Sequence, residues 1–309
     1  MADGHDLIVA AALIDTLVFT DGRAEENVAG GAGLYALAGA ALFSDDALLV
    51  TGTGEDLPTT FGPWLDRNGL GKNGLRIADP NTPRNLLRYV DERTRTETPV
   101  FGHEHFSRVE PTVEDIGRVI GGARAAYVFR NTERGFWDGL RRLRAEHDFT
   151  LLWEIGLDAC APSERPTIEK LVAEVDAFSL NLQEAGLIFS ASGEDELVRR
   201  LIDWPVRHIF LRAGRRGSYA ISAGKVHFVP SLSISPVDVT GGGNAYSGAA
   251  LVGLARGESA LKAAAMGTVA ASIAIGQLGL PEPRDPNVRA RALAALDALA
   301  ATIEKETTA

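Results

Sequence analysis

Residues 236–248 read PVDVTGGGNAYSG and are the part of the sequence most informative about the fold. Three consecutive glycines, Gly241 to Gly243, stand in it between an extended segment and an alanine-rich helix. Because glycine has no β-carbon, successive backbone N–H groups can converge there on one point. The unpaired amides and the positive dipole end of the following helix add to this effect. The junction therefore predicts a seat for an anion, most often a phosphate, with the Asn244 side chain at its edge.

The composition is that of a soluble globular protein. The 309 residues are 45% hydrophobic and 23% charged, which is enough for a substantial single core. The formal net charge of −10 disfavours nonspecific binding to nucleic acid or to anionic membranes. Cys160 is the single cysteine, which excludes an intramolecular disulfide and a thiolate metal cluster. The acidic first residues and the lack of a long apolar run predict a cytoplasmic protein with a small-molecule partner.

The order of apolar and amphipathic segments predicts the fold class. From residue 125 onward, expected strands and helices alternate at 125–129, 136–147, 150–153, 167–174, 177–180, 194–202 and 208–212. This alternation indicates βαβ units and a mostly parallel sheet. Residues 7–12 form a continuous apolar run, as expected for a buried central strand. Residues 84–90 and 95–101 alternate around the charged turn 91–94 and predict a half-solvated hairpin, whose strand is expected to continue through His103 and His105. Further helices are expected at 32–41, 57–68, 243–255, 259–276 and 287–304.

Six landmarks, in order, resemble motifs of the PfkB (ribokinase-like) family of carbohydrate kinases. They are residues 6–15 ending in Asp15, the Gly30-Gly31 segment with Tyr35, residues 50–56, the pair Asn181 and Glu184, the Gly214-to-Gly217 turn after Arg212, and the glycine run that follows Asp238 and Thr240. The resemblance implies one domain over residues 1–309 with a ribokinase-like α/β fold, a three-layer α/β/α sandwich. It also implies a small β-sheet lid from residues of about 13–29 and 80–108.

The same resemblance implies roles for individual residues. Asp15, Gly30, Gly31 and Tyr35 would bind the acceptor; Gly241, Gly242, Gly243 and Asn244 would be catalytic; Asn181, Glu184, Arg212, Gly214 and Gly217 would bind ATP with Mg²⁺; Asp238 and Thr240 would hold a monovalent cation such as K⁺. Two of these groups have a simpler interpretation that stays open. Asp238 and Thr240 can cap the loop, and Asn181 with Glu184 can cap a helix. The family also implies pairing of two copies through the lid.

Three departures from the family's pattern bear on activity. The family's catalytic base is an aspartate where this chain has Asn244, and an amide cannot accept a proton. The strand that usually ends Asp-Pro-Asn reads Trp153-Glu154-Ile155, and the usual asparagine of the Gly-Gly helix is replaced, with Tyr35 nearby. We expect an ATP-dependent kinase for a hydroxyl of a sugar, nucleoside or polyol. The alternatives are a pseudokinase that binds nucleotide or sugar, and a pocket reused for other chemistry. Asn244→Asp is expected to raise phosphotransfer if the rest of the site is intact.

Overall fold

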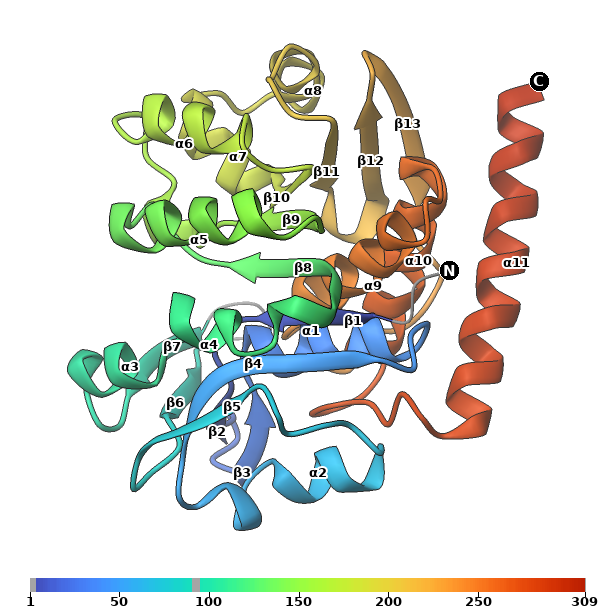
Figure 1. Cartoon of the computed structure of the whole chain (residues 1–309). Helices are drawn as coiled ribbons and strands as arrows, with labels where there is room; N and C mark the ends of the chain where they lie inside the picture. The colour runs from blue at the N-terminus through green and yellow to red at the C-terminus, as the bar shows by residue number, and fades with distance from the viewer. Residues whose placement is uncertain (1–3, 91–94, 309) are drawn as a thin grey trace.

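The central element of the structure is a nine-stranded sheet within the residues that the computed structural model describes, 4–90 and 95–308 (Figure 1). Its strand order is β13-β12-β11-β10-β9-β8-β1-β4-β5. The strands are β1 (His5–Val9), β4 (Ala47–Gly54), β5 (Leu75–Asp79), β8 (Ala123–Phe129), β9 (Thr150–Glu154), β10 (Ala177–Asn181), β11 (His208–Arg212), β12 (Gly217–Ser222) and β13 (Lys225–Pro230). Neighbours pair in parallel from β5 to β11, and β12 and β13 add an antiparallel edge. The predicted parallel sheet is confirmed.

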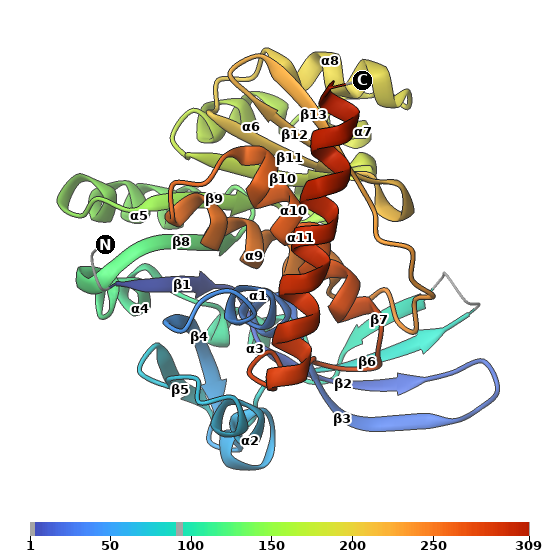
Figure 2. The ribbon, with the colours of Figure 1, turned by 90° about the vertical axis from the view of Figure 1, so that its right-hand side faces the viewer.

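Helices cover both faces of this sheet and give it three layers. One face carries α1 (Ala32–Ala41), α2 (Gly62–Arg67), α9 (Gly242–Ala255), α10 (Ala260–Ile275) and α11 (Pro286–Thr308). The other carries α4 (Val113–Gly117), α5 (Arg134–Glu146), α6 (Arg165–Val172), α7 (Leu182–Phe189) and α8 (Glu194–Ile202). Short 3₁₀ turns lie at Leu57–Thr59, Ile120–Gly122, Leu157–Ala159 and Gly214–Arg216. Figure 2 shows α11 lying across the layer that α9 and α10 form. No described helix is long and apolar enough to cross a membrane.

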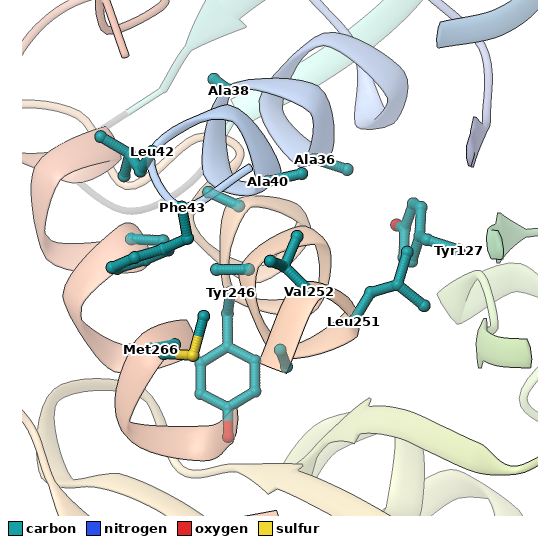
Figure 3. Packing of buried hydrophobic residues seen from close by; sticks show 14 of the residues in the cluster. Ala36, Ala38, Ala40, Leu42, Phe43, Tyr127, Tyr246, Leu251, Val252 and Met266 are labelled. Atoms are coloured by element: carbon teal, nitrogen blue, oxygen red, sulfur yellow. The ribbon is translucent and has the colours of Figure 1, made fainter. Parts of the chain in front are cut away.

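Small residues bring α1 and α9 into close contact. A β-carbon on Gly39 would lie 2.1 Å from the carbonyl oxygen of Ala245, and one on Gly248 would lie 2.0 Å from that of Ala36. Larger side chains, among them Tyr246 and Met266, fill the space around these helices (Figure 3). This packing fixes the first turns of α9, and with them the glycine run, against the Gly-Gly helix.

A second, smaller sheet lies beside the first. Its order is β3-β2-β6-β7, formed by β3 (Ala24–Gly30), β2 (Leu13–Val18), β6 (Arg84–Tyr89) and β7 (Arg95–Pro99). The predicted hairpin strands are present as β6 and β7, whereas the predicted turn at 91–94 lies outside the described residues. In Figure 2 this sheet extends to one side of the main body, below β11 and β12.

Three predicted elements differ from the structure. Asp15 does not end the first central strand, because β1 stops at Val9 and Asp15 belongs to β2 of the small sheet. The predicted strand through His103 and His105 is instead helix α3 (His103–Val109), which starts after Gly102 at φ 77°. The predicted helix 57–68 is broken, because Leu57–Thr59, with Pro58 inside it, form a 3₁₀ turn and α2 begins only with Gly62-Pro63.

Candidate active site

The carboxyl ends of the parallel strands meet the start of α9, and two cavities open there. A cleft of about 460 Å³ is lined by residues that include Asp15, Gly31, Tyr35, Asn85, Thr240 and Asn244. A second cavity of about 540 Å³ is lined by residues that include Arg212, Gly214, Gly217, Pro236, Val239 and Ile275. Open α/β sheets bind ligands at this end of their strands. Of the predicted acceptor-site residues, Asp15, Gly31 and Tyr35 line the first cavity. Of the predicted nucleotide-site residues, Arg212, Gly214 and Gly217 line the second. Gly30, Asn181 and Glu184 line neither cavity.

The glycine run stands between the two cavities. Gly241 lines the first, whereas Gly242 and Gly243 line the second. Gly241 adopts φ 72° and is the N-cap of α9, and no side chain of a described residue caps the helix there. The first amides of a 14-residue helix therefore remain available to an anion at the boundary between the cavities.

Polar side chains of the small sheet form one wall of the first cleft. Asp15 is 5% exposed and pairs in register with Asn85 of β6. A β-carbon on Gly30 would lie 2.7 Å from Oδ2 of Asp15, so only glycine leaves room for this carboxylate. Asn85 is 1% exposed; its Nδ2 donates to Oε1 of Glu97 at 2.5 Å, and its Oδ1 has no partner among the described residues. The wall offers hydrogen-bond acceptors suited to hydroxyl groups.

The first cleft is acidic. Five carboxylates line it, from Asp15, Glu97, Glu110, Glu133 and Asp158. Arg130 is the single basic residue among the described residues of the lining, and it pairs with Glu110 at 2.7 Å and with Glu133 at 3.3 Å. The negative electrostatic potential in the cleft therefore disfavours a ligand that carries a negative charge there.

A buried polar network lies beneath the glycine run, beginning at Asn244. Nδ2 of Asn244 donates to Oη of Tyr127 at 3.2 Å and to Oε1 of Glu154 at 3.4 Å. The Tyr127 hydroxyl donates to Oε2 of Glu154 at 3.0 Å, and Nη1 of Arg212 donates to Oε1 at 2.5 Å. Burial, and then the charge of Glu154, raises the pKa of Tyr127 well above its ordinary value of 10. The tyrosine is therefore a hydrogen-bond donor rather than an anion.

The hydrogen-bond network continues from Arg212 to Glu184, which with Asn181 is the pair predicted to bind ATP with Mg²⁺. Nη2 of Arg212 donates to Oε2 of Glu184 at 3.4 Å. Burial alone would lower the pKa of Arg212, but Glu154 and Glu184 outweigh this and raise it, so the guanidinium stays charged. Burial also raises the pKa of Glu184, with Glu154 adding to the rise and Arg212 opposing it. Asn181 and Glu184 cap α7 reciprocally, as the simpler interpretation of their spacing expects.

Asp238 caps its own loop. Its Oδ1 accepts from the amide of Thr240 at 3.0 Å and from the Thr240 hydroxyl at 2.6 Å. Oη of Tyr89 on β6 donates to the same oxygen at 3.5 Å. The capping interpretation describes these contacts, and the monovalent-cation site remains a prediction.

Comparison with known proteins agrees with this geometry. Residues 143–287 match the model of the pfkB family, described as carbohydrate kinases. This region, just under half of the chain, is therefore similar to the pfkB carbohydrate kinases. The chain is 26% identical to the cytidine kinase of Thermococcus kodakarensis over 261 residues, 82% of this chain and 89% of that protein.

Solved structures with the ribokinase-like fold superpose on this chain over nearly its whole length. Adenosine kinase from Sinorhizobium meliloti gives a TM-score of 0.78 at 20% identity, over 96% of this chain and 100% of that one. A ribokinase II from E. coli, solved with ATP and Mg²⁺, gives 0.76 at 13% identity, over 96% and 99%. The predicted fold class is confirmed.

The pfkB match contains the glycine run, Asn181 and Glu184, whereas Asp15, Gly30 and Gly31 precede it. The structure places Asp15 and Gly31 in the lining of the first cleft and Gly30 against the Asp15 carboxylate. Sequence reasoning missed Asn85, Glu97, Phe106, Arg130 and Asn131 as lining residues. Arg130 and Asn131 directly follow β8. Polar residues at the carboxyl end of a parallel strand indicate a ligand site, so the sequence could have predicted these two.

Proposed function

We propose that this protein transfers a phosphoryl group from ATP, with Mg²⁺, to a hydroxyl of a neutral sugar or nucleoside. The observation that carries the proposal is the position of the glycine run between the two cavities. A phosphate held by its amides would face the first cleft on one side, here called the acceptor cleft, and the second cavity on the other, here called the nucleotide cavity. The kinases to which the chain is similar, and the related structure with ATP and Mg²⁺, support this assignment.

The residues present suit a magnesium nucleotide. Nε of Arg212 is buried without a partner among the described residues, and the side chain lines the nucleotide cavity, so a phosphate oxygen would complete its bonding. Gly214 and Gly217 adopt φ 59° and 133°, a backbone conformation that favours glycine, and leave these two positions of the turn without side chains. Asn181 and Glu184 would organise the water around Mg²⁺, which neutralises phosphate charge when bound.

The acceptor hydroxyl would be oriented by Asn244 and by Asp15. Its oxygen would attack the γ-phosphorus while the bond to the ADP oxygen breaks, and its proton would pass to an oxygen of the transferred phosphoryl group and reach solvent when the product leaves. The transition state of such transfers is loose, so positioning and charge stabilisation carry most of the effect. The amides of Gly241 to Gly243 would stabilise the oxygens of the group in transit.

The small sheet would act as a lid within a single domain of residues 1–309. Closing it over the cleft would exclude water and limit ATP hydrolysis. β3 is an edge strand of this sheet, so two copies of the protein could pair through it to form a dimer. Light scattering, which gives the molar mass in solution, tests this dimer. Asp238 and Thr240 would also hold K⁺, which is tested by comparing the phosphotransfer rate in K⁺ with the rate in Li⁺. The protein would act in the cytoplasm, where ATP is available.

The test is ADP formation from MgATP with a panel of neutral nucleosides, sugars and polyols. We expect one class to stimulate ADP release, and Asp15→Ala to raise the KM for that acceptor at least about tenfold with a smaller change in kcat. Asp66→Ala, on the exposed surface of α2, is the matched control. Nucleotide binding without turnover for any acceptor would contradict the kinase, and the absence of both would contradict the phosphate seat.

A further inference from the structure

Glu154 is the unexplained residue of the site. It stands where related strands are expected to read Asp-Pro-Asn, and it is 3% exposed at the end of β9. Leu152, two residues before it, belongs to the core under α1 and α9, whereas Trp153 belongs to the opposite core. Since strand residues alternate between faces, the Glu154 carboxylate points to the α9 side of the sheet. A carboxylate buried there needs strong partners.

Its partners join the two cavities. Oε1 accepts from Arg212, which lines the nucleotide cavity, and from Asn244, which lines the acceptor cleft. Oε2 accepts from Tyr127, which is fully buried. Glu154 therefore hydrogen-bonds to one residue of each cavity. The third glycine permits this arrangement, because a β-carbon on Gly243 would lie 2.4 Å from Nη1 of Arg212.

The network fixes which atom can occupy the position beside Glu154. The Tyr127 hydrogen is used on Glu154, so the tyrosine oxygen can only accept from residue 244. Glu154 also accepts. Both neighbours thus require a donor, which the Asn244 amide supplies and a carboxylate does not. With Nδ2 held inward, the other branch of the planar amide, Oδ1, is left for the cleft.

We propose that Glu154 is a positioning residue, held by Arg212, that orients Asn244 so that its carbonyl oxygen accepts the hydrogen bond of the acceptor hydroxyl. The inference rests on the proposed function. The negative charge of this site then lies at position 154 rather than at 244. Asn244→Asp would place a second carboxylate against Glu154, so the gain in rate expected from the sequence alone is replaced by a loss.

The experiment is a double-mutant cycle of Glu154→Gln and Asn244→Asp. We expect each single variant to lower kcat by about 100-fold, with the KM values for ATP and acceptor within about threefold. The double variant, in which an amide again faces a carboxylate, should regain at least about tenfold over Asn244→Asp. Additive losses in the cycle, or a rate gain in Asn244→Asp, would overturn the proposal.

Asp6→Asn is the matched control for loss of a buried carboxylate. Asp6 is fully buried, accepts from Arg124 at 2.8 and 2.7 Å and from the Ser44 hydroxyl at 2.5 Å, and lies in β1 away from both cavities. It should keep the kcat of the unaltered protein. Should Glu154→Gln fail to fold by circular dichroism, Tyr127→Phe provides the second variant, since it removes another partner of the Asn244 amide; it should lower kcat without changing the KM values.

A second readout does not need turnover. In protein labelled with ¹⁵N-asparagine, the side-chain NH₂ signals of Asn244, assigned by their loss in Asn244→Asp, should shift in Glu154→Gln and stay in place in Asp6→Asn. Unchanged signals would overturn the role of Glu154 even if no acceptor is found. Turnover by the unaltered protein, measured separately, decides the proposed function.

Discussion

The ring of Tyr35 lies directly on the backbone of Gly241. A β-carbon on Gly241 would be 2.0 Å from Cγ of Tyr35, and Gly241 holds φ 72°. Both facts exclude a side chain at this position, the first by overlap with a ring that is 3% exposed and the second by backbone strain. The contact joins α1, which lines the first cleft, to the first residue of the proposed phosphate seat.

Gly241→Ala should therefore abolish most activity, lowering kcat/KM by at least about 100-fold because the seat moves relative to the acceptor. Gly257→Ala is the control: Gly257 has φ 73° and open space around it. It should cost about 1 kcal/mol of unfolding free energy and leave kcat unchanged. Chemical denaturation and steady-state kinetics measure the two effects. Equal kinetic losses in both variants would show that backbone strain, and not the contact with Tyr35, is responsible.

The acidic lining predicts the charge of the acceptor. A sugar or nucleoside that carries a phosphate or carboxylate away from the reacting hydroxyl should bind at least about tenfold more weakly than its neutral form at low salt. Added salt should narrow the difference, since exposed charges are screened. Glu97→Gln should narrow it too, whereas Glu26→Gln on the exposed part of β3 should not. Tighter binding of the anionic form would contradict this prediction.

The raised pKa of Glu184 predicts where activity is lost in acid. Burial is the largest cause of the rise above the ordinary value of 4.5, and the ionised form is the one that can organise Mg²⁺ and its water. As the pH falls, the carboxylate takes up its proton before an ordinary glutamate would. The acid limb of kcat against pH should therefore lie above pH 4.5, and excess Mg²⁺ should shift it to lower pH. Full activity at pH 4.5 in protein that remains folded would exclude Glu184 from this role.

How much of the site could be predicted depended on how local each feature is. The glycine run and the Asn181–Glu184 cap are set by neighbouring residues, so the sequence showed them directly. The placement of Asn85 and Glu97 depends on β6 pairing with β2 and β7, which no local pattern specifies. Glu154 departs from the family's pattern in sequence, but its contacts with Asn244 and Arg212 join three elements that are distant in the chain. The strand predicted at His105 is wrong because alternation over three residues is too short to distinguish a strand from a helix.

Cys160 provides a prediction independent of the proposed function. Burial raises the pKa of its thiol to about 12, and the side chain is 5% exposed. The thiol should stay protonated at pH 8 and should react with a thiol reagent only through unfolding. Labelling should be negligible in the native protein and complete in denaturant. Rapid labelling of the folded protein would show that the 157–160 turn opens locally.

Gly242 and Gly243 offer a comparison within one turn of α9. A β-carbon on Gly243 would press on Nη1 of Arg212 at 2.4 Å, and one on Gly242 would press on Cγ2 of Ile275 at 2.7 Å. Both alanine variants add one methyl group to the same helix start, and the apolar side chain of Ile275 can shift while its carbonyl oxygen keeps its bonds from the amides of Val237 and Asp238. Gly243→Ala should weaken MgATP binding at least about tenfold, because the displaced Arg212 loses its place in the nucleotide cavity and its contact with Glu154. Gly242→Ala should change the affinity by no more than about threefold. Titration calorimetry measures both, and a larger loss in Gly242→Ala would mean that Arg212 does not contact the nucleotide.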